Sequence, residues 1–349
     1  MALVILGILV SLRCHKPAIL PSNQSPLGAL PARFRRERLL IVGCGDVGLR
    51  VAKLQAGRVR LFALTSSPDR VPLLRDCGIT PLAGNLDHPA TLDRLAGVAT
   101  RIVHMAPPST AEGQAQWWRD TRTLALLQAL RRRTPARSLA YGSTSGVYGD
   151  CAGARVDESR PVAPSTPRAQ RRVDAELLVC HLGRTTGTRI SVLRIPGIYA
   201  TDRAGGTPRE RLMRGTPVLQ AQDDVYTNHI HADDLARATL AALWRGRPQR
   251  VYNVSDDSDL KMADYFDLAA DLYGLPRPRR LARDTAQSQL PLMLLSFMSE
   301  SRRLVNHRLK SELGVRLRYP TVRQGLLAQP AGTEAVRQPL PLTGTASTD

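Results

Sequence analysis

Aromatic residues are scarce in this chain. Phe, Trp and Tyr make up 4% of its 349 residues, whereas 43% of the residues are hydrophobic. A core with so few rings must consist mostly of aliphatic side chains, which argues against an aromatic-rich sandwich and favours helices with buried strands. The length predicts about two domains.

Cysteine pairs and long apolar runs are also missing. The five cysteines form no C-x-x-C pair, and their odd number argues against a secreted disulfide framework or a zinc site. The apolar stretch at residues 1–12 is shorter than the roughly 20 residues that span a bilayer. It also lacks the basic start and the cleavage site of a signal peptide. We therefore expect a cytoplasmic protein with no membrane segment and no metal.

Lysine is nearly absent, although the chain is strongly basic. The formal net charge is +19, yet only four of the 49 basic residues are lysine, and the arginines are scattered along the sequence. A site that follows a nucleic-acid backbone needs clustered charge and usually aromatic stacking partners. The composition therefore favours a solvated basic surface, and we expect no nucleic-acid partner.

From residue 38 onward, short apolar runs alternate with amphipathic stretches. Strands are predicted at 39–42, 59–64, 79–83, 101–106, 138–141, 190–195 and 251–254, and helices at 46–56, 69–77, 90–96 and 112–133. Strands that alternate with helices predict βαβ units and a parallel sheet that is covered on both faces. The expected fold class is α/β, with a Rossmann-like doubly wound parallel sheet and a small C-terminal α/β substrate lobe.

The alternation of strands and helices breaks after Pro196. Residues 201–225 are rich in Gly, Pro and Arg, and the later helices are predicted at 232–245, 261–273 and 306–313. The expected organisation is an unstructured extension over residues 1–37, an NAD(P)-binding domain over 38–200, a substrate-binding lobe over 201–327 and a disordered tail over 328–349.

A glycine-rich loop follows the first predicted strand. Gly43, Gly45 and Gly48 form G-x-G-x-x-G directly before a predicted helix. The first glycine allows a tight turn, the second lets the backbone approach a pyrophosphate, and the third lets the helix pack on the strand. The amides at the helix start, around Asp46 and Val47, would hold the anion. The strand–turn–helix context favours a dinucleotide site over a purely structural glycine turn.

The end of the second predicted strand bears on the choice between NADP and NAD. An acidic residue about 20 positions after the loop would bind the ribose 2′-hydroxyl of NAD. Thr65 stands there instead, and the first carboxylate comes at Asp69. Arg70 could pair with a 2′-phosphate, and a solvated helix residue is the equal alternative. We expect NADP in preference to NAD.

Two further strand ends are expected to line the cofactor. Asn85 and Leu86 follow the third strand, where a side chain could meet the adenine. Ala106 and Pro107 follow the fourth strand, where a small residue lets the backbone lie against the cofactor. Each pair is equally compatible with an ordinary turn at a strand end.

Several motifs, in order, resemble the extended and atypical branches of the short-chain dehydrogenase/reductase superfamily, which includes NAD-dependent epimerase/dehydratase proteins. Besides the glycine loop, the matching segments are residues 85–87, 143–149, 156–158, 194–199, 228–236, 303–306 and 312–314. The resemblance covers about residues 38–327. It implies an NAD or NADP cofactor and a small-molecule substrate. It also implies a homodimer formed through the helices near 112–133 and 166–185.

Part of that superfamily's catalytic apparatus is missing. The resemblance implies a strand-end Ser or Thr that orients the substrate oxygen, and a Tyr and a Lys four residues apart that move a proton. Thr144 stands at the strand-end position, but Arg168 and Arg172 stand at the Tyr and Lys positions. Arginine does not deprotonate near neutral pH. Arg172 could hold the nicotinamide ribose and Arg168 an anionic substrate, and two solvent-facing arginines are the alternative.

Another group must then move the proton. Tyr148 and Tyr199 lie just beyond strand ends, where open α/β sheets bind ligands. His229 and His231 titrate near neutral pH. Packing and structural hydrogen bonds are the alternative roles for all four side chains.

These positions complete the site that the sequence predicts. Thr144, Tyr148 and Arg172 are the expected catalytic residues, and Ser143, Ser145, Arg168, Pro196 and His231 are expected around the substrate. The prediction is an NAD(P)-dependent oxidoreductase or epimerase-like enzyme that acts on a small carbonyl, hydroxyl or sugar-derived compound. The alternative is a cofactor-binding sensor or scaffold without hydride chemistry.

Overall fold

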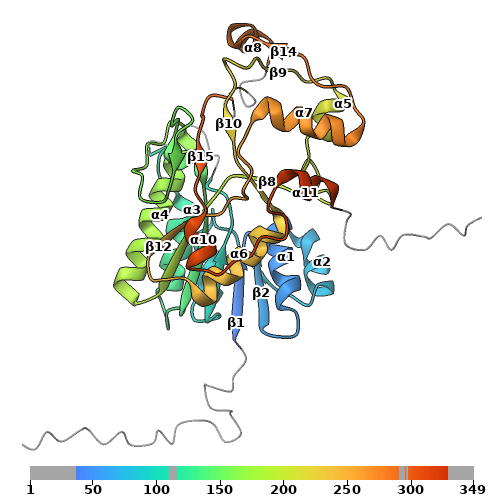
Figure 1. Ribbon diagram of the computed structural model, residues 1–349. Helices are drawn as coiled ribbons and strands as arrows, with labels where there is room; N and C mark the ends of the chain where they lie inside the picture. The colour runs from blue at the N-terminus through green and yellow to red at the C-terminus, as the bar shows by residue number, and fades with distance from the viewer. Residues whose placement is uncertain (1–36, 110–115, 291–294, 296–297, 329–349) are drawn as a thin grey trace, which may run out of the picture. The chain divides into compact units, whose positions relative to one another are not determined.

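A parallel sheet forms the centre of the computed structural model, which describes residues 37–109, 116–290, 295 and 298–328 (Figure 1). Its strands are β1 (Arg38–Val42), β2 (Arg60–Thr65), β3 (Thr80–Ala83), β4 (Arg101–His104), β5 (Ser138–Thr144), β7 (Arg189–Ile195) and β12 (Arg250–Asn253). They pair in parallel in the order β12-β7-β5-β4-β1-β2-β3. The order reverses between β1 and β4, so the prediction of a doubly wound Rossmann-like sheet is confirmed.

Helices cover both faces of this sheet. The side chains of β1 alternate, as strand geometry requires: Leu39 and Ile41 join one core cluster, and Leu40 and Val42 join the other. The first cluster is covered by α1 (Asp46–Gln55) and α6 (Ala232–Arg245), and the second by α3 (Thr121–Leu130) and α4 (Pro167–Thr186). The sheet is therefore buried on both sides, as the continuous apolar strands predict.

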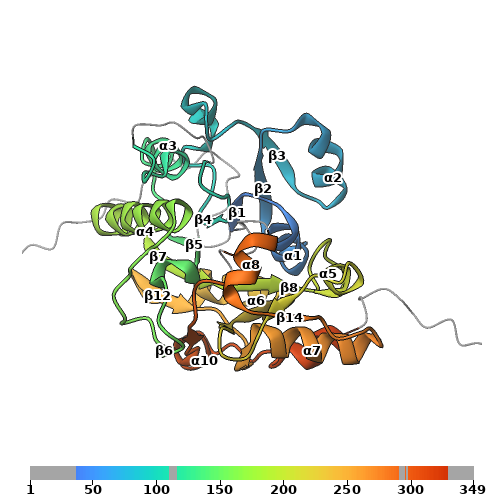
Figure 2. The same cartoon turned by 90° about the horizontal axis from the view of Figure 1, so that it is seen from above.

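A smaller α/β lobe lies beyond the carboxyl ends of the main strands (Figures 1 and 2). Its own core contains buried residues of α5 (Arg209–Met213), α7 (Met262–Tyr273), α8 (Arg283–Gln289) and α11 (Val322–Leu327). Short strand pairs connect its segments, namely β8 (Gly197–Tyr199) with β11 (His229–His231), β9 (Val218–Leu219) with β14 (Arg280–Leu281), β10 (Tyr226–Thr227) with β13 (Leu260–Lys261) and β6 (Arg155–Val156) with β15 (Arg303–Leu304). The predicted C-terminal lobe is present.

The structure corrects the boundary between the two parts. Residues 201–327 were assigned to the lobe, but α6 packs on α1 and β12 pairs with β7, so both belong to the main sheet layer. The chain therefore leaves the Rossmann domain, returns to it and leaves again. A single composition change near residue 200 could not reveal this path.

Two predicted helices also differ from the structure. The helix expected over 112–133 begins at Thr121, because the Asp120 side chain accepts a hydrogen bond from the Thr123 amide and caps it. The segment predicted at 90–96 is a 3₁₀ helix, η3 (Pro89–Leu95). The extension before residue 37 and the tail after residue 328 lie outside the described residues.

Two expectations from composition concern membranes and cysteines. Among the described residues, no helix has both the length and the hydropathy to cross a bilayer. Cys44, Cys77, Cys151 and Cys180 are all free thiols.

Candidate functional site

The glycine loop turns sharply at the carboxyl end of β1. Gly43 has a φ of +83°, and a Cβ built there would lie 2.3 Å from the backbone nitrogen of Ala106. Only glycine tolerates both the left-handed backbone and this contact. The loop is therefore packed directly against the backbone of Met105 and Ala106 just after β4, at the point where the strand order reverses.

Gly45 has a different environment. It is the N-cap residue of α1, and a Cβ built on it would find no atom within 4 Å. The first-turn amides of the helix, at Asp46 and Val47, have no partner within the helix, and the helix dipole favours an anion beside them. Gly48 packs against β1, since its Cβ would lie 3.1 Å from the Ile41 side chain. The three glycines thus fit the roles predicted for a pyrophosphate loop.

The Asp46 side chain turns away from the loop. It accepts hydrogen bonds from Arg50 at 3.1 Å and from Arg203 at 2.8 Å. Arg50 also bonds to Asp202 and to Asp233 at the start of α6. The carboxylate therefore connects α1 to the lobe, and the contribution of Asp46 to an anion site would come from its amide.

Arg70 contacts the glycine loop. Its Nη2 donates to the Cys44 carbonyl at 2.6 Å. Thr65, at the end of β2, shares hydrogen bonds with the backbone of Ser67. The NADP preference stays a prediction.

The ends of β3 and β4 are linked to α3. The Asn85 side chain accepts from the Asp87 amide in a local turn, and Leu86 is half-buried. Asp87 forms a bidentate pair with Arg122, whose Nη1 also donates to the Pro107 carbonyl. Asn85 is therefore engaged in a turn, which is one of the two roles considered for it.

Arg172 lies beneath the ends of β4 and β5 and is almost completely buried. Its Nη1 donates to the Gly142 carbonyl at 2.8 Å, to the Tyr141 hydroxyl at 3.1 Å and to the Ala106 carbonyl at 3.4 Å. Burial raises the pKa of the Tyr141 phenol. Arg172 therefore holds the two strand ends on which a nicotinamide would lie. The alternative that both arginines face solvent is wrong for Arg172, whereas Arg168 is exposed.

The hydroxyl residues at the end of β5 face different surroundings. Thr144 is half-buried, and its Oγ1 accepts from the Gly146 amide at 3.2 Å. Ser143 donates to Glu176, which is paired with Arg194 in the interior. Ser145 is buried. Of the three residues, Thr144 is the least buried.

Tyr148 supports the site from behind. Its side chain is fully buried, and its hydroxyl donates to Asn253 Oδ1 at 2.8 Å. Burial raises the pKa of this phenol. The Asn253 amide group in turn donates to the carbonyls of Val156 and Val305. These bonds connect the segment after β5 to β12, so the geometry favours the packing role for Tyr148.

The two histidines of β11 are also buried. His231 accepts a hydrogen bond from the Asp233 amide, which caps α6, and its ring lies 3.9 Å from that of Tyr319. Burial lowers the pKa of His229 to about 4, so the ring is neutral at pH 7. Tyr199 lies edge-on to both rings and donates to the Thr321 carbonyl. Pro196, just before β8, is half-buried.

One carboxylate near Thr144 has no counterpart in the sequence prediction. Glu300 and Thr144 both lie next to Gly146. A Cβ added to this glycine would be 4.0 Å from Glu300 Oε2 and 3.6 Å from Thr144 Oγ1. Glu300 accepts from the Ser165 hydroxyl, 135 residues away along the chain, and pairs with Arg302 at 2.7 Å. No local motif signals a contact of such long range.

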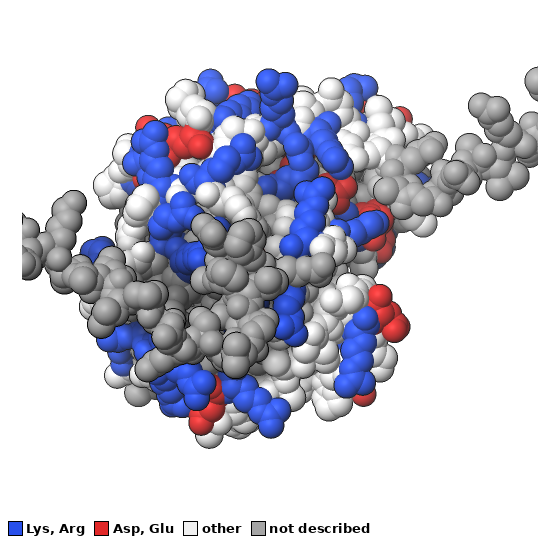
Figure 3. All heavy atoms as spheres, turned by 90° about the horizontal axis from the view of Figure 1, so that it is seen from below, with Lys and Arg blue, Asp and Glu red and all other residues white. Residues whose placement is uncertain are grey.

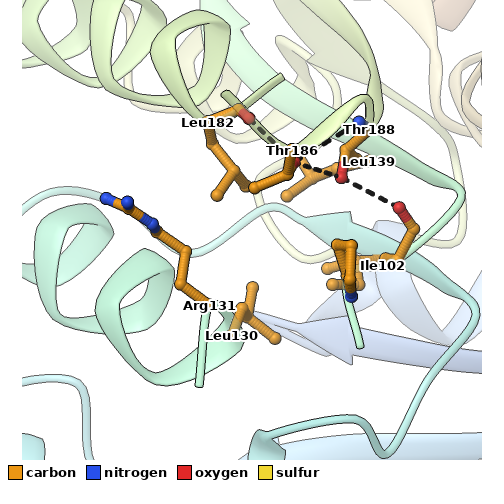
Figure 4. A pocket seen from close by; sticks show the side chains of 9 residues that line it. Ile102, Leu130, Arg131, Leu139, Leu182, Thr186 and Thr188 are labelled. Atoms are coloured by element: carbon orange, nitrogen blue, oxygen red, sulfur yellow. Dashed lines mark hydrogen bonds between the residues drawn. The ribbon is translucent and has the colours of Figure 1, made fainter. Parts of the chain in front are cut away.

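A small apolar cavity elsewhere in the domain is not part of this site (Figure 4). It lies between the ends of α3 and α4, and its lining includes Ile102 and Leu139. These are the second residues of β4 and β5, so the cavity is at the amino edge of the sheet, opposite the glycine loop.

The geometry of the loop agrees with a comparison with known protein families. A model described as the NAD dependent epimerase/dehydratase family matches residues 40–255. The chain belongs to this family. The prediction of an enzyme related to NAD-dependent oxidoreductases, epimerases and dehydratases is thereby confirmed at the level of the family.

Individual relatives agree with this assignment. A 3-diazoavenalumate denitrifying reductase from Streptomyces sp is 27% identical over 309 residues, which are 83% of this chain and 99% of that protein. The solved structure of a functionally unknown conserved protein from Silicibacter pomeroyi DSS is 31% identical, with a TM-score of 0.71 over 83% of this chain and 96% of that one. A UDP-glucose 4-epimerase from Thermus thermophilus, solved with NAD, shares the fold at 20% identity, with a TM-score of 0.65 over the same shares of the two chains.

Proposed function

We propose that the protein is an NAD(P)-dependent oxidoreductase of the atypical short-chain dehydrogenase/reductase type, acting on a small carbonyl, hydroxyl or sugar-derived compound. The main observation behind this proposal is the open space at Gly45, beside the first-turn amides of α1, where a pyrophosphate could bind. It lies at the reversal of the strand order, where such sheets bind ligands. The relative that is matched over 99% of its length is named a reductase, which favours hydride transfer.

The preferred cofactor in this proposal is NADP. Arg70 supports it because its guanidinium already lies on the loop, bonded to the Cys44 carbonyl, and the end of β2 has no carboxylate to repel a 2′-phosphate. The bound nicotinamide would supply the hydride. The chain's own residues then have to orient the substrate and supply or accept a proton.

Thr144 is the residue we assign to the substrate oxygen, because it combines a strand-end position with partial exposure. Arg172 positions the backbone under the reacting groups through the Gly142 and Ala106 carbonyls. The exposed Arg168, one helical turn earlier, would attract an anionic substrate. Tyr148 is bonded to Asn253, and His231 caps α6, so both side chains already have structural roles. We therefore assign the proton transfer to a water molecule held at Thr144.

Turnover tests this proposal. The full-length chain is mixed with NADPH and a panel of aldehydes, ketones and nucleotide sugars, and NADPH absorbance is followed. We expect oxidation of NADPH with at least one class and its loss in Thr144→Ala. The matched control is Thr185→Ala, on the exposed end of α4, which should leave the rate unchanged. If NADPH is consumed equally by wild type and Thr144→Ala, the role of Thr144 is wrong.

The second candidate is a cofactor-binding sensor or scaffold. Arg168 and Arg172 stand where the superfamily's Tyr and Lys would be, and neither can exchange a proton near neutral pH. Tight NADPH binding with no turnover across the whole panel would favour this candidate.

We also propose a homodimer through α3 and α4, which pack side by side. Leu177 on α4 is 62% exposed, and Trp117 and Trp118 near the start of α3 are 46% and 44% exposed. These exposed apolar side chains, together with the homodimer that the family resemblance implies, support this interface. Leu177→Lys should shift the mass measured by light scattering from dimer to monomer. A cytoplasmic location remains part of the proposal.

A further inference from the structure

The amino edge of the main sheet is lined with arginine. Among the strands that the structure describes, β1, β2, β4, β7 and β12 each begin with an arginine, and Arg137 directly precedes β5. In space these strands are neighbours, in the order β12-β7-β5-β4-β1-β2. Six neighbouring strands at about 4.8 Å spacing extend over roughly 24 Å.

The helices add more positive charge to the same edge. In a βαβ unit each helix ends where the next parallel strand begins, so helix carboxyl ends and strand starts share one side of the sheet. Arg58 follows α1, Arg131 and Arg133 follow α3, Arg184 lies in the last turn of α4, and Arg245 ends α6. The fold thus gathers residues that are far apart in the sequence. We call this set, together with the strand-start arginines, the amino-edge arginines.

Much of this charge is not neutralised. Glu37, Asp93 and Glu312 pair with amino-edge arginines or with Arg132 beside them. Among the amino-edge arginines, Arg101 is buried and donates to Ser138 and to the Leu243 carbonyl. Those that are exposed and have no carboxylate partner among the described residues are Arg58, Arg60, Arg131, Arg133, Arg184 and Arg245. Figure 3 views the molecule from this side, and Lys and Arg far exceed Asp and Glu among the described residues on it.

Helix dipoles explain only part of this arrangement. A cation in the last turn of a helix stabilises it by about 0.3–1 kcal/mol, which accounts for Arg184 and Arg245 one by one. Arginine also begins the short lobe strands β6, β14 and β15, so a strand start alone does not indicate a ligand. The position of six exposed, unpaired arginines at one edge of the sheet suggests a ligand that is larger than any single helix end.

We propose that the exposed, unpaired amino-edge arginines bind the phosphate backbone of a nucleic-acid duplex without sequence preference. The guanidinium group pairs bidentately with phosphate. One strand of a duplex presents a phosphate about every 3.4 Å, so roughly seven fall within the length of the row. Trp117 and Trp118, the exposed aromatic residues of the described chain, lie before α3 and thus at the other edge, so the stacking platform of a single-strand binder is missing here.

This surface is separate from the proposed cofactor site, because the glycine loop lies at the opposite ends of the strands. The arginines are scattered along the sequence, which predicted no nucleic-acid partner, but the parallel topology gathers them at one edge of the sheet. Duplex binding is therefore expected whether or not the protein has oxidoreductase activity.

Fluorescence anisotropy with a labelled duplex of about 20 base pairs tests it, with the full-length chain and KCl varied from about 50 to 200 mM. A dissociation constant on the order of 10⁻⁶ to 10⁻⁴ M is expected. With about four phosphate contacts the affinity should fall about 100-fold over this salt range.

Charge-reversal variants test whether the duplex binds at the amino-edge arginines. Arg58→Glu with Arg60→Glu, and Arg131→Glu with Arg133→Glu, should each weaken binding at least about 10-fold and reduce the salt slope by about two. The control, Arg214→Glu with Arg323→Glu, makes the same charge change on exposed residues of the lobe and should have little effect. The unfolding temperature and the far-UV circular dichroism should be unchanged in every variant, which confirms folding.

Three results would overturn the proposal. The first is no binding at the lowest salt, or binding with no salt dependence. The second is an equal loss of binding in the lobe control, which would show that only the net charge matters. The third is tighter binding to vesicles that contain anionic lipid than to the duplex, which would make a membrane surface the partner.

Discussion

A methyl group added at Gly45 should weaken cofactor binding while the protein still folds. The residue has φ −81° and ψ −153°, which is extended backbone at the border of the region that alanine favours, and its Cβ would find no protein atom within 4 Å. Gly45→Ala should therefore change the free energy of unfolding by no more than about 1 kcal/mol. If the space belongs to a pyrophosphate, the methyl group should cost about 1–3 kcal/mol of binding, as overpacking does.

Such a cost corresponds to NADPH binding weakened by about 5- to 150-fold. The assay is a fluorescence titration with NADPH beside urea unfolding of the same preparation. Gly43→Ala is the contrasting variant: its Cβ would lie 2.3 Å from the Ala106 nitrogen at a φ of +83°, so the protein itself should be destabilised. Wild-type NADPH affinity in a stable Gly45→Ala protein would refute the assignment of the loop.

Three further predictions concern selectivity, catalysis and pH. Arg70→Gln should weaken NADPH binding by about 1.5–3 kcal/mol and leave NADH binding nearly unchanged, as paired titrations would show. Thr144→Ser should keep most of the turnover that Thr144→Ala loses. Burial raises the pKa of Asp256 to about 7. The folded protein thus holds this proton more tightly than the unfolded chain, and stability should fall as pH rises from about 4 to 7. Asp256→Asn should flatten this dependence in urea titrations at several pH values.

The sheet and the glycine loop could be predicted from sequence because both are local signals. Five of the seven main strands begin within one residue of their predicted start and end within one residue of their predicted end, since buried parallel strands appear as continuous apolar runs. The loop motif directly follows such a strand. The family resemblance was carried by several such short motifs in fixed order, and it is confirmed.

The details of the site depend on contacts between distant segments. Tyr148 reaches Asn253 on β12, and Ser165 donates to Glu300, 135 residues away along the chain. Neither contact produces a periodic pattern in the sequence. Arg172 is a different case: its position was predicted from the resemblance, but its burial against strand-end carbonyls was not, because exposed arginine is the usual expectation.

Calorimetric titration of the full-length chain with NADPH and with NADH decides whether the glycine loop binds a pyridine nucleotide. We expect saturable heat for one cofactor per chain, tighter binding of NADPH than of NADH, and a matching rise in the unfolding temperature. Absence of heat and of any thermal shift with both reduced and both oxidised pyridine nucleotides would rule out a dinucleotide site at this loop.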